Sequence, residues 1–154
     1  ITVIPSGGAS CNCGKTGCLE TIASATGIVR LAKEAIKRNP DSLLSNYSSS
    51  DDPLTAKEVF DAAAERDKEA KEVLAYVTDI LGMTIANLAI ACNPSKIVIG
   101  GGVSKAGEKL LIPLRESFDK YALPRTSEAC EFAIAELGND AGVIGGAFLV
   151  KQNL

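Results

Sequence analysis

The stretch 11–20, Cys-Asn-Cys-Gly-Lys-Thr-Gly-Cys-Leu-Glu, constrains the fold most because it places three thiols in one short turn. Thiolates at this spacing can converge on one tetrahedral Zn²⁺, about 2.3 Å from each sulfur, when glycines let the backbone turn tightly. We therefore predict a zinc site whose ligands are Cys11, Cys13 and Cys18. The fourth ligand stays open. Histidine is the usual partner of three cysteines and the chain has none, so water, another residue or a residue upstream of position 1 completes the site.

A disulfide explains these three cysteines less well, since a Cys-x-Cys pair closes a strained ring. A structural zinc is favoured over a catalytic one, because three thiolates leave the metal poorly acidic toward water. The remaining cysteines, Cys92 and Cys130, stand apart and are predicted to be packing residues. An odd total of five cysteines, three of them crowded, indicates a reducing compartment with one metal site.

The composition favours one globular domain or lobe, since 154 residues with 46% hydrophobic content can form one sizeable core. A net charge of −3 argues against nucleic acid or an anionic membrane as the main partner, because both require a basic surface. The longest apolar stretch, 80–92, is short for a membrane span, and no signal peptide opens the chain. We therefore expect a cytoplasmic protein with no nucleic-acid partner and no membrane partner.

Hydrophobic periodicity predicts alternating helices and strands after the cysteine turn. A β-branched run at 1–4 is expected to be the tail of a strand that begins elsewhere, and 41–53 a mobile surface loop. Pro113 should kink or restart the helix that contains it. The predicted helices cover 22–36, 56–66, 70–91, 110–121 and 141–151, and the predicted strands cover 96–99 and 132–135.

This alternation predicts a helix-rich α/β fold with a parallel sheet, in which ligands bind at the carboxyl ends of the strands. The loop at that position after the strand 96–99 is Gly-Gly-Gly-Val-Ser. Three glycines let a ligand approach the backbone and offer N–H donors near a helix start, as a nucleotide site requires. A tight strand-to-helix turn would use the same residues, so both interpretations stay open. The candidate nucleotide-binding residues are Gly100, Gly101, Gly102, Val103 and Ser104.

Glu20 stands directly after the cysteine turn, at the predicted start of a helix, where the helix dipole favours an ionised carboxylate. A solvated carboxylate with no further role is the alternative. The adjoining metal turn favours a functional role, because a carboxylate held rigidly can accept two hydroxyl hydrogen bonds, as recognition of a sugar requires.

The motif Cys-x-Cys-Gly-x-x-Gly-Cys-x-Glu at 11–20 resembles the zinc-site signature of the ROK family (repressors, open reading frames and sugar kinases). The segment 20–30 resembles the glucokinase branch found in Gram-positive bacteria, and 97–104 and 137–145 are similar to later segments of the family. The resemblance covers essentially the whole chain. It implies an actin-like ATPase fold of two ribonuclease-H-like lobes, as in hexokinases, of which 1–154 resembles the second, carboxy-terminal lobe.

The resemblance also assigns roles to individual positions. It makes the three cysteines zinc ligands, Glu20 a sugar-binding residue, and 100–104 part of the nucleotide site. The family's Glu-x-Gly-His element, its phosphate loop and its general-base aspartate are expected upstream of position 1, so this chain holds no catalytic residue. The intact protein is expected to transfer the γ-phosphoryl group of ATP to the 6-hydroxyl of glucose with Mg²⁺, as part of glycolysis and glucose metabolism.

Alternative functions stay open. The same lobe could belong to a ROK transcriptional repressor or to a kinase for another hexose, and a zinc-stabilised interaction module without catalysis is a third possibility. A helix-turn-helix ahead of position 1 would indicate the repressor. We also expect a homodimer, because an incomplete sheet edge and broad apolar helix faces recruit a second copy.

Overall fold

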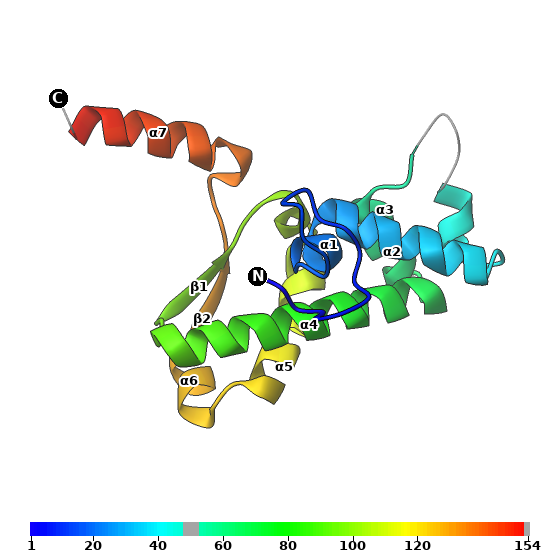
Figure 1. Ribbon diagram of the computed structural model, residues 1–154, viewed down its shortest axis with the longest axis horizontal. Coiled ribbons are helices and arrows are strands. Elements are labelled where there is room, and N and C mark those ends of the chain that lie inside the picture. The colour runs from blue at the N-terminus through cyan, green and yellow to red at the C-terminus, as the bar shows by residue number, and fades with distance from the viewer. Residues whose placement is uncertain (48–52, 153–154) are drawn as a thin grey trace.

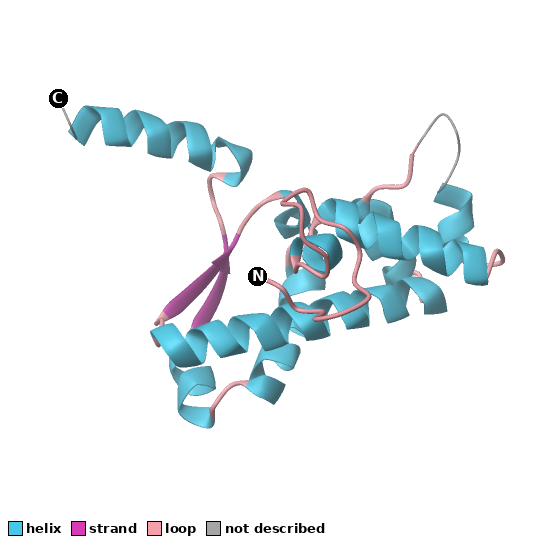
Figure 2. Cartoon of the chain, in the orientation of Figure 1, coloured by secondary structure: helices cyan, strands magenta, loops and turns pink. Residues whose placement is uncertain are grey.

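The computed structural model describes residues 1–47 and 53–152 as a helix-rich α/β fold with one small sheet (Figure 1). Helices surround a long central helix, and the strands lie side by side at one end of the molecule (Figure 2). The helices are α1 (Glu20–Ala23), α2 (Ala25–Arg38), α3 (Ala56–Ala64), α4 (Lys68–Cys92), α5 (Glu108–Tyr121), α6 (Pro124–Ala129) and α7 (Ala141–Gln152). The strands are β1 (Lys96–Ile99) and β2 (Glu131–Ile134), and three short 3₁₀ turns are η1 (Leu43–Tyr47), η2 (Gly102–Ala106) and η3 (Gly138–Asp140).

β1 and β2 pair in parallel, so the predicted sheet direction is confirmed. Ile97 pairs with Phe132, and Phe132 packs edge-to-face on Phe118 of α5 with ring centroids 5.0 Å apart. The glycine loop and η2 follow directly from the carboxyl end of β1. The predicted ligand loop therefore lies at the carboxyl end of a strand of the parallel sheet.

α4 is the central helix, as its apolar stripe predicted, and it runs for 25 residues. Its length and composition alone would allow it to cross a membrane. Its buried side chains, including Val73, Val77 and Ala89, instead join core clusters with residues of the neighbouring helices. We therefore treat α4 as the core helix on which the other helices are assembled.

Local signals placed two helix starts correctly. Thr55 and Glu58 form the predicted capping box at the start of α3. Asp67 caps α4, since its carboxylate accepts a hydrogen bond from the backbone N–H of Ala70 at 2.8 Å. The same carboxylate accepts bonds from Ser42 Oγ and the backbone N–H of Leu43, so it also ties η1 to the helix start.

Asp67→Asn is expected to destabilise the chain by about 1–2 kcal/mol at pH 7, because a cap and a tie to η1 are weakened together. Burial raises the Asp67 pKa, but hydrogen bonds from Ala70, Leu43 and Ser42 outweigh it and hold the pKa below its usual value. Stability from this carboxylate is therefore present above a pH of about 4 and is lost as the pH falls through the lowered pKa.

Urea unfolding at pH 7 and pH 3 checks the Asp67 prediction, with exposed Asp41→Asn as a control expected to change stability by less than about 0.5 kcal/mol. The difference between wild type and Asp67→Asn should shrink at pH 3. A difference that is equal at both pH values would contradict the role of the ionised carboxylate.

Several sequence-based element boundaries were wrong. Residues 1–4 form no strand: Thr2 makes an isolated antiparallel bridge with Cys18, and the N–H groups of 3 and 4 bond to Gly17 O. The helix predicted over 22–36 is two helices, because Ser24 is extended and caps α2 through Gly27 N.

Further differences between the predicted and the observed elements lie after residue 40. α5 continues through Pro113 without a restart. α6 was not predicted, and β2 begins one residue earlier than expected. In the expected loop 41–53, 43–47 forms η1, and 48–52, where mobility was expected, lies outside the described residues.

Candidate functional site

The cysteine turn is a tight hairpin-like loop closed by a bridge between Ser10 and Thr16. Inside it, Cys11 N bonds to Lys15 O at 2.8 Å. The three thiol sulfurs all lie within 4.8 Å of one another, and Cys13 Sγ is 3.6 Å from Cys18 Sγ. Sulfurs of a tetrahedral zinc site with 2.3 Å bonds are about 3.8 Å apart, so the geometry fits three thiolate ligands.

The environments of the three thiols differ. The backbone N–H of Lys15 and the neighbouring thiols lower the pKa of Cys13, which is exposed. Hydrogen bonding to Cys13, together with burial, raises the pKa of Cys18 to about 11. Cys13 therefore ionises before Cys18, and binding of a cation that needs all three thiolates would release protons.

The turn connects directly to Glu20, the first residue of α1 and an exposed side chain. Thr21 Oγ1 donates to Cys18 O at 2.7 Å, and Arg30 of α2 donates to Thr21 O at 2.9 Å. The backbone next to Glu20 is thus held by both the cysteine turn and α2. The predicted position of Glu20 at a helix start is confirmed.

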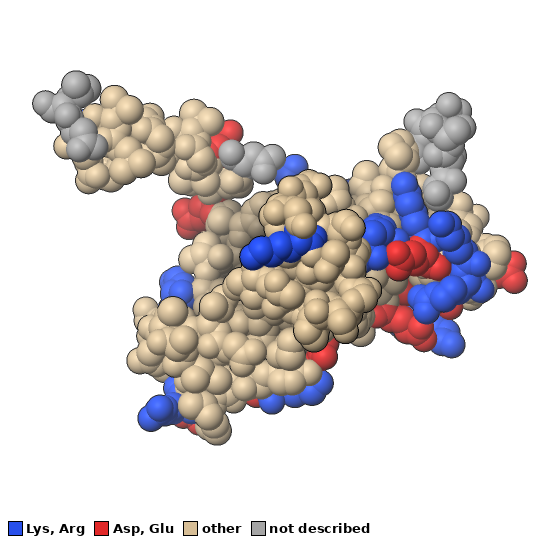
Figure 3. Space-filling view, viewed as in Figure 1, with Lys and Arg blue, Asp and Glu red and all other residues tan. Residues whose placement is uncertain are grey.

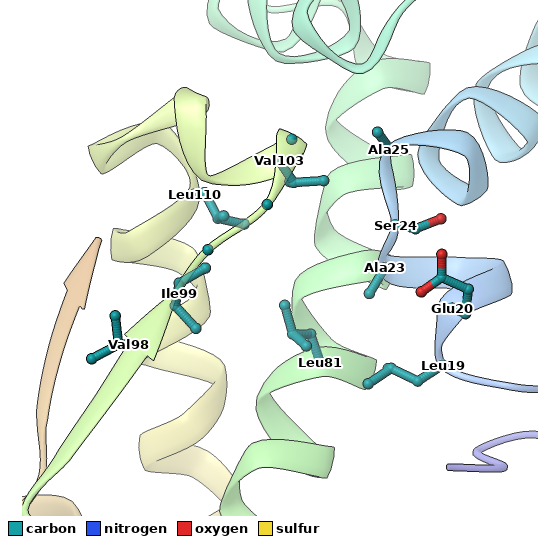
Figure 4. A pocket seen from close by; sticks show the side chains of 13 residues that line it. Leu19, Glu20, Ala23, Ser24, Ala25, Leu81, Val98, Ile99, Val103 and Leu110 are labelled. Carbon is teal, nitrogen blue, oxygen red and sulfur yellow. The ribbon is translucent and has the colours of Figure 1, made fainter. Parts of the chain in front are cut away.

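One cavity of about 420 Å³ joins two predicted site elements that are 80 residues apart in the chain. Figure 4 shows Glu20 and Ser24 on one wall, Ile99 and Val103 on the opposite wall, and Leu81 of α4 between them. Both walls therefore border one space large enough for a small polar ligand and part of a second one. The complete lining is Leu19, Glu20, Ala23, Ser24, Ala25, Leu81, Val98, Ile99, Gly100, Gly101, Gly102, Val103 and Leu110.

Ser104 does not line this cavity. It is buried, and its hydroxyl donates to Gly101 O at 2.7 Å. Of the five candidate nucleotide residues, the structure therefore brings 100–103 to the cavity and gives Ser104 the role of bracing their loop. Leu81 was missed because its place depends on the packing of α4, and Ser24 could have been found as an N-cap residue.

A second cavity of about 490 Å³ shares Ala25, Gly102 and Val103 with the first. Lys57, Lys105 and Lys109 line it together with Asp61. Asp61 bonds both Lys109 and Lys57 at 2.8 Å, and these contacts lower its pKa. A cation-rich cavity that Glu20 does not line thus adjoins the glycine loop.

The comparisons with known proteins identify the family of the chain. A family model described as the ROK family matches residues 1–153. This chain belongs to the ROK family. Its fold class, one lobe of the actin-like ATPase fold, is confirmed by ROK kinase structures.

Three ROK proteins illustrate what this chain is similar to. It is 59% identical to a glucokinase of Halalkalibacterium halodurans, covering 99% of this chain and 46% of that protein. It is 34% identical to the DNA-binding transcriptional repressor Mlc of Escherichia coli, and the match covers 94% of this chain and 34% of that protein. The chain also matches a crystal structure of a ROK family glucokinase from Streptomyces griseus in complex with glucose and AMPPNP. The TM-score is 0.83 and the sequence identity 34%, and the match covers 99% of this chain and 50% of that protein. The ROK chain thus spans about half the length of these glucokinases.

Proposed function

We propose that this ROK chain is the part of an ATP-dependent glucokinase that positions glucose and the nucleotide for phosphoryl transfer. The observation that supports this most is the shared cavity, which is lined by Glu20 on one side and by 100–103 on the other. Phosphoryl transfer needs the acceptor hydroxyl and the phosphates held close together, and a single cavity between the two elements meets that need.

On the sugar side, Glu20 accepts hydrogen bonds from two neighbouring hydroxyls of glucose. An ionised carboxylate is suited to this because it has two acceptor oxygens and no donor. The hydrogen bonds of Thr21 to Cys18 and Arg30 keep the helix start in place, so that the carboxylate is preorganised.

On the nucleotide side, the loop 100–103 carries the phosphates of ATP on its backbone N–H groups, and the nucleotide extends toward the cavity that contains Lys105. Mg²⁺, when bound with ATP, would supply positive charge that neutralises the charge developing on the phosphates during transfer. We assign no general base to this chain. Closure of a second lobe over the cavity would exclude water, which otherwise competes as the phosphoryl acceptor.

The rival ROK functions are less well supported. Identity to the glucokinase exceeds identity to the repressor, 59% against 34%. A kinase for another hexose would use the same Glu20 and differ in its relative activity toward that hexose. An interaction module without catalysis would show no sugar affinity in any longer form of the protein.

A chimera tests the proposed function. The portion of the H. halodurans glucokinase outside the segment matched by this chain is joined to residue 1. The chimera should form glucose 6-phosphate from glucose and ATP, whereas the 154-residue chain alone should release no ADP in response to glucose, because it lacks a base and a phosphate loop. An inactive, folded chimera, or glucose-dependent ADP release by the chain alone, would contradict the proposal.

We also propose that the cysteine turn binds a structural zinc that holds the segment before Glu20. Cys11, Cys13 and Cys18 would supply three ligands. Because the chain has no histidine for the fourth, zinc is expected to be held loosely and to be lost on dialysis against a chelator. Metal analysis before and after dialysis checks this, and one zinc per chain retained after dialysis would contradict it.

Two expectations about the whole protein stay with this proposal. A cytoplasmic location is proposed from the free cysteines. A homodimer is proposed from apolar side chains exposed on α4, Tyr76, Leu88 and Ile90. Light scattering of the chimera that gives a monomer across a wide concentration range would reject the dimer.

A further inference from the structure

The shared cavity holds a second polar side chain besides Glu20. Among the described residues that line this cavity, Glu20 and Ser24 alone carry polar side chains, and every other one is glycine or aliphatic. An ionised Glu20 can only accept hydrogen bonds. A sugar hydroxyl is a donor and an acceptor at once, so a site that satisfies it fully needs a donor as well. Ser24 is the side chain in this cavity that can supply one.

The backbone places Ser24 one helical turn beyond Glu20. α1 begins at Glu20, and Ser24 directly follows its last residue, Ala23. Side chains four positions apart on a helix lie on the same face, with Cβ atoms about 5–6 Å apart. Figure 4 shows the hydroxyl of Ser24 and the carboxylate of Glu20 on the same wall of the cavity. One hydroxyl group of a ligand can therefore reach both side chains.

The hydrogen bonds that Ser24 makes within the protein do not require its proton. Its Oγ caps α2 by accepting a hydrogen bond from the backbone N–H of Gly27 at 3.0 Å. Thr26 Oγ1 lies 2.9 Å from Ser24 Oγ, and either hydroxyl can be the donor of this bond. When Thr26 donates, Ser24 Oγ accepts two hydrogen bonds and keeps its own proton for a third group. The cap therefore fixes the position of the Ser24 hydroxyl without consuming its proton.

The wall formed by Glu20 and Ser24 suits an uncharged ligand. Glu20 is the one charged residue in the described lining of the cavity. Figure 3 shows the charged side chains on that face of the molecule gathered mainly over α2 and the start of α4. An ionised carboxylate without a lysine or arginine in the same lining repels phosphate groups, so the hydroxyls of a sugar are the ligand class that both side chains can share.

We infer that Ser24 is a second sugar-binding residue, whose hydroxyl donates a hydrogen bond to the same glucose hydroxyl that donates to Glu20. This inference rests on the proposed function and adds a determinant of sugar specificity to it. The bridged hydroxyl has its proton and a lone pair satisfied together in a largely apolar cavity, where an unpaired polar group is costly. A sugar that lacks this hydroxyl is rejected, because it leaves both side chains without their partner.

Substitutions at Ser24 can separate sugar binding from helix capping. Ser24→Gly removes the hydroxyl and keeps a residue that is itself tolerated well at an N-cap. Ser24→Thr keeps both the hydroxyl and the cap, since Ser24 has the extended backbone that threonine adopts readily. Thr26→Val is the matched control, because it removes the neighbouring hydroxyl and leaves the Ser24 proton in place. Circular dichroism and thermal unfolding should be close to those of wild type for all three variants.

Calorimetric titration of the chimera with glucose, in the absence of ATP, tests the inference without requiring turnover. Ser24→Gly should weaken glucose binding about 10-fold, the size of one hydrogen bond between uncharged groups. Ser24→Thr and Thr26→Val should stay within about two-fold of wild type, since both keep the Ser24 donor. In turnover, kcat/KM for glucose should fall about 10-fold in Ser24→Gly, with the KM for ATP unchanged.

Glucose analogues that each lack one ring hydroxyl identify the bridged group. For one analogue, wild type and Ser24→Gly should bind equally, because the partner of Ser24 is already missing. For the other analogues, Ser24→Gly should still weaken binding about 10-fold.

Each result of these titrations decides the inference. Equal glucose binding by wild type and Ser24→Gly overturns it, as does a loss in Ser24→Thr or Thr26→Val as large as that in Ser24→Gly. A loss in Ser24→Gly that is the same for every analogue assigns the effect to the helix cap and also overturns it.

The two readouts keep the inference apart from the proposed function. An active chimera whose glucose binding does not respond to Ser24→Gly rejects the Ser24 inference alone. A chimera that shows the expected Ser24 effect on glucose binding but forms no glucose 6-phosphate supports the inference and rejects the proposed function. A folded chimera that binds no glucose rejects both.

Discussion

Glu20→Gln is expected to lower kcat/KM for glucose about 100-fold in the chimera, with little change in the KM for ATP. The carboxylate accepts two charge-assisted hydrogen bonds from the sugar, and the amide can replace one of them at best while presenting a donor to the other hydroxyl. A loss of about 2.7 kcal/mol, within the range for hydrogen bonds to a charged group, corresponds to this factor.

Glu108→Gln is the matched control for Glu20. Both glutamates are exposed, and each is the first residue of a helix, but Glu108 lines neither of the two cavities described. A general effect of removing a negative charge from a helix start would lower both activities equally. Equal losses, or unchanged glucose kinetics in Glu20→Gln, would contradict the assignment of Glu20 to the sugar.

Gly17→Ala is expected to destabilise the chain by at least about 3 kcal/mol and to abolish metal binding by the cysteine turn. Gly17 has φ of +68°, and a Cβ there would lie 2.0 Å from Ile4 O. Gly17 O also accepts the backbone N–H groups of Val3 and Ile4, so the added methyl group would break the link between the amino-terminal segment and Cys18. Thermal unfolding and zinc titration measure the two effects.

Gly14→Ala separates the steric effect from the backbone effect. Gly14 has φ of +84° in the same turn, but nothing lies within 4 Å of an added Cβ. This variant should therefore cost only about 1–2 kcal/mol, the penalty for a side chain in the left-handed region. Equal destabilisation by the two variants would show that close packing of Gly17 on Ile4 is not what fixes the turn.

Local patterns in the sequence predicted the elements whose stability is local. The capping box of Thr55 and Glu58, the cap at Asp67 and the apolar stripe of α4 gave helix starts that the structure confirms. The three cysteines were close in sequence, so their convergence followed from the turn itself.

Other features depended on contacts between distant segments. The backbone hydrogen bonds of 1–4 join this segment to Gly17 and Leu19 and not to a strand of the sheet, and no local pattern distinguishes these outcomes. The shared cavity needs α1 and the loop after β1 to pack on the same part of α4, near Leu81. The spacing of residues within each segment does not indicate that the two segments pack on the same part of α4.

For α7, the sequence predicted the secondary structure but not the exposure of its side chains. The helix at 141–151 was predicted correctly from its position after the loop 138–140, with Asp140 as the expected N-cap. The same apolar residues gave no indication that they would lie exposed, because apolar burial is not directional.

A crystal structure of the chimera with glucose and AMPPNP tests the central claim most directly, namely that one cavity positions both ligands. Two sugar hydroxyls should lie about 2.6–3.2 Å from the Glu20 carboxylate oxygens, and the phosphates should lie on the backbone N–H groups of Gly101 and Gly102. Glucose bound away from Glu20, or phosphates that do not contact the glycine loop, would contradict the account.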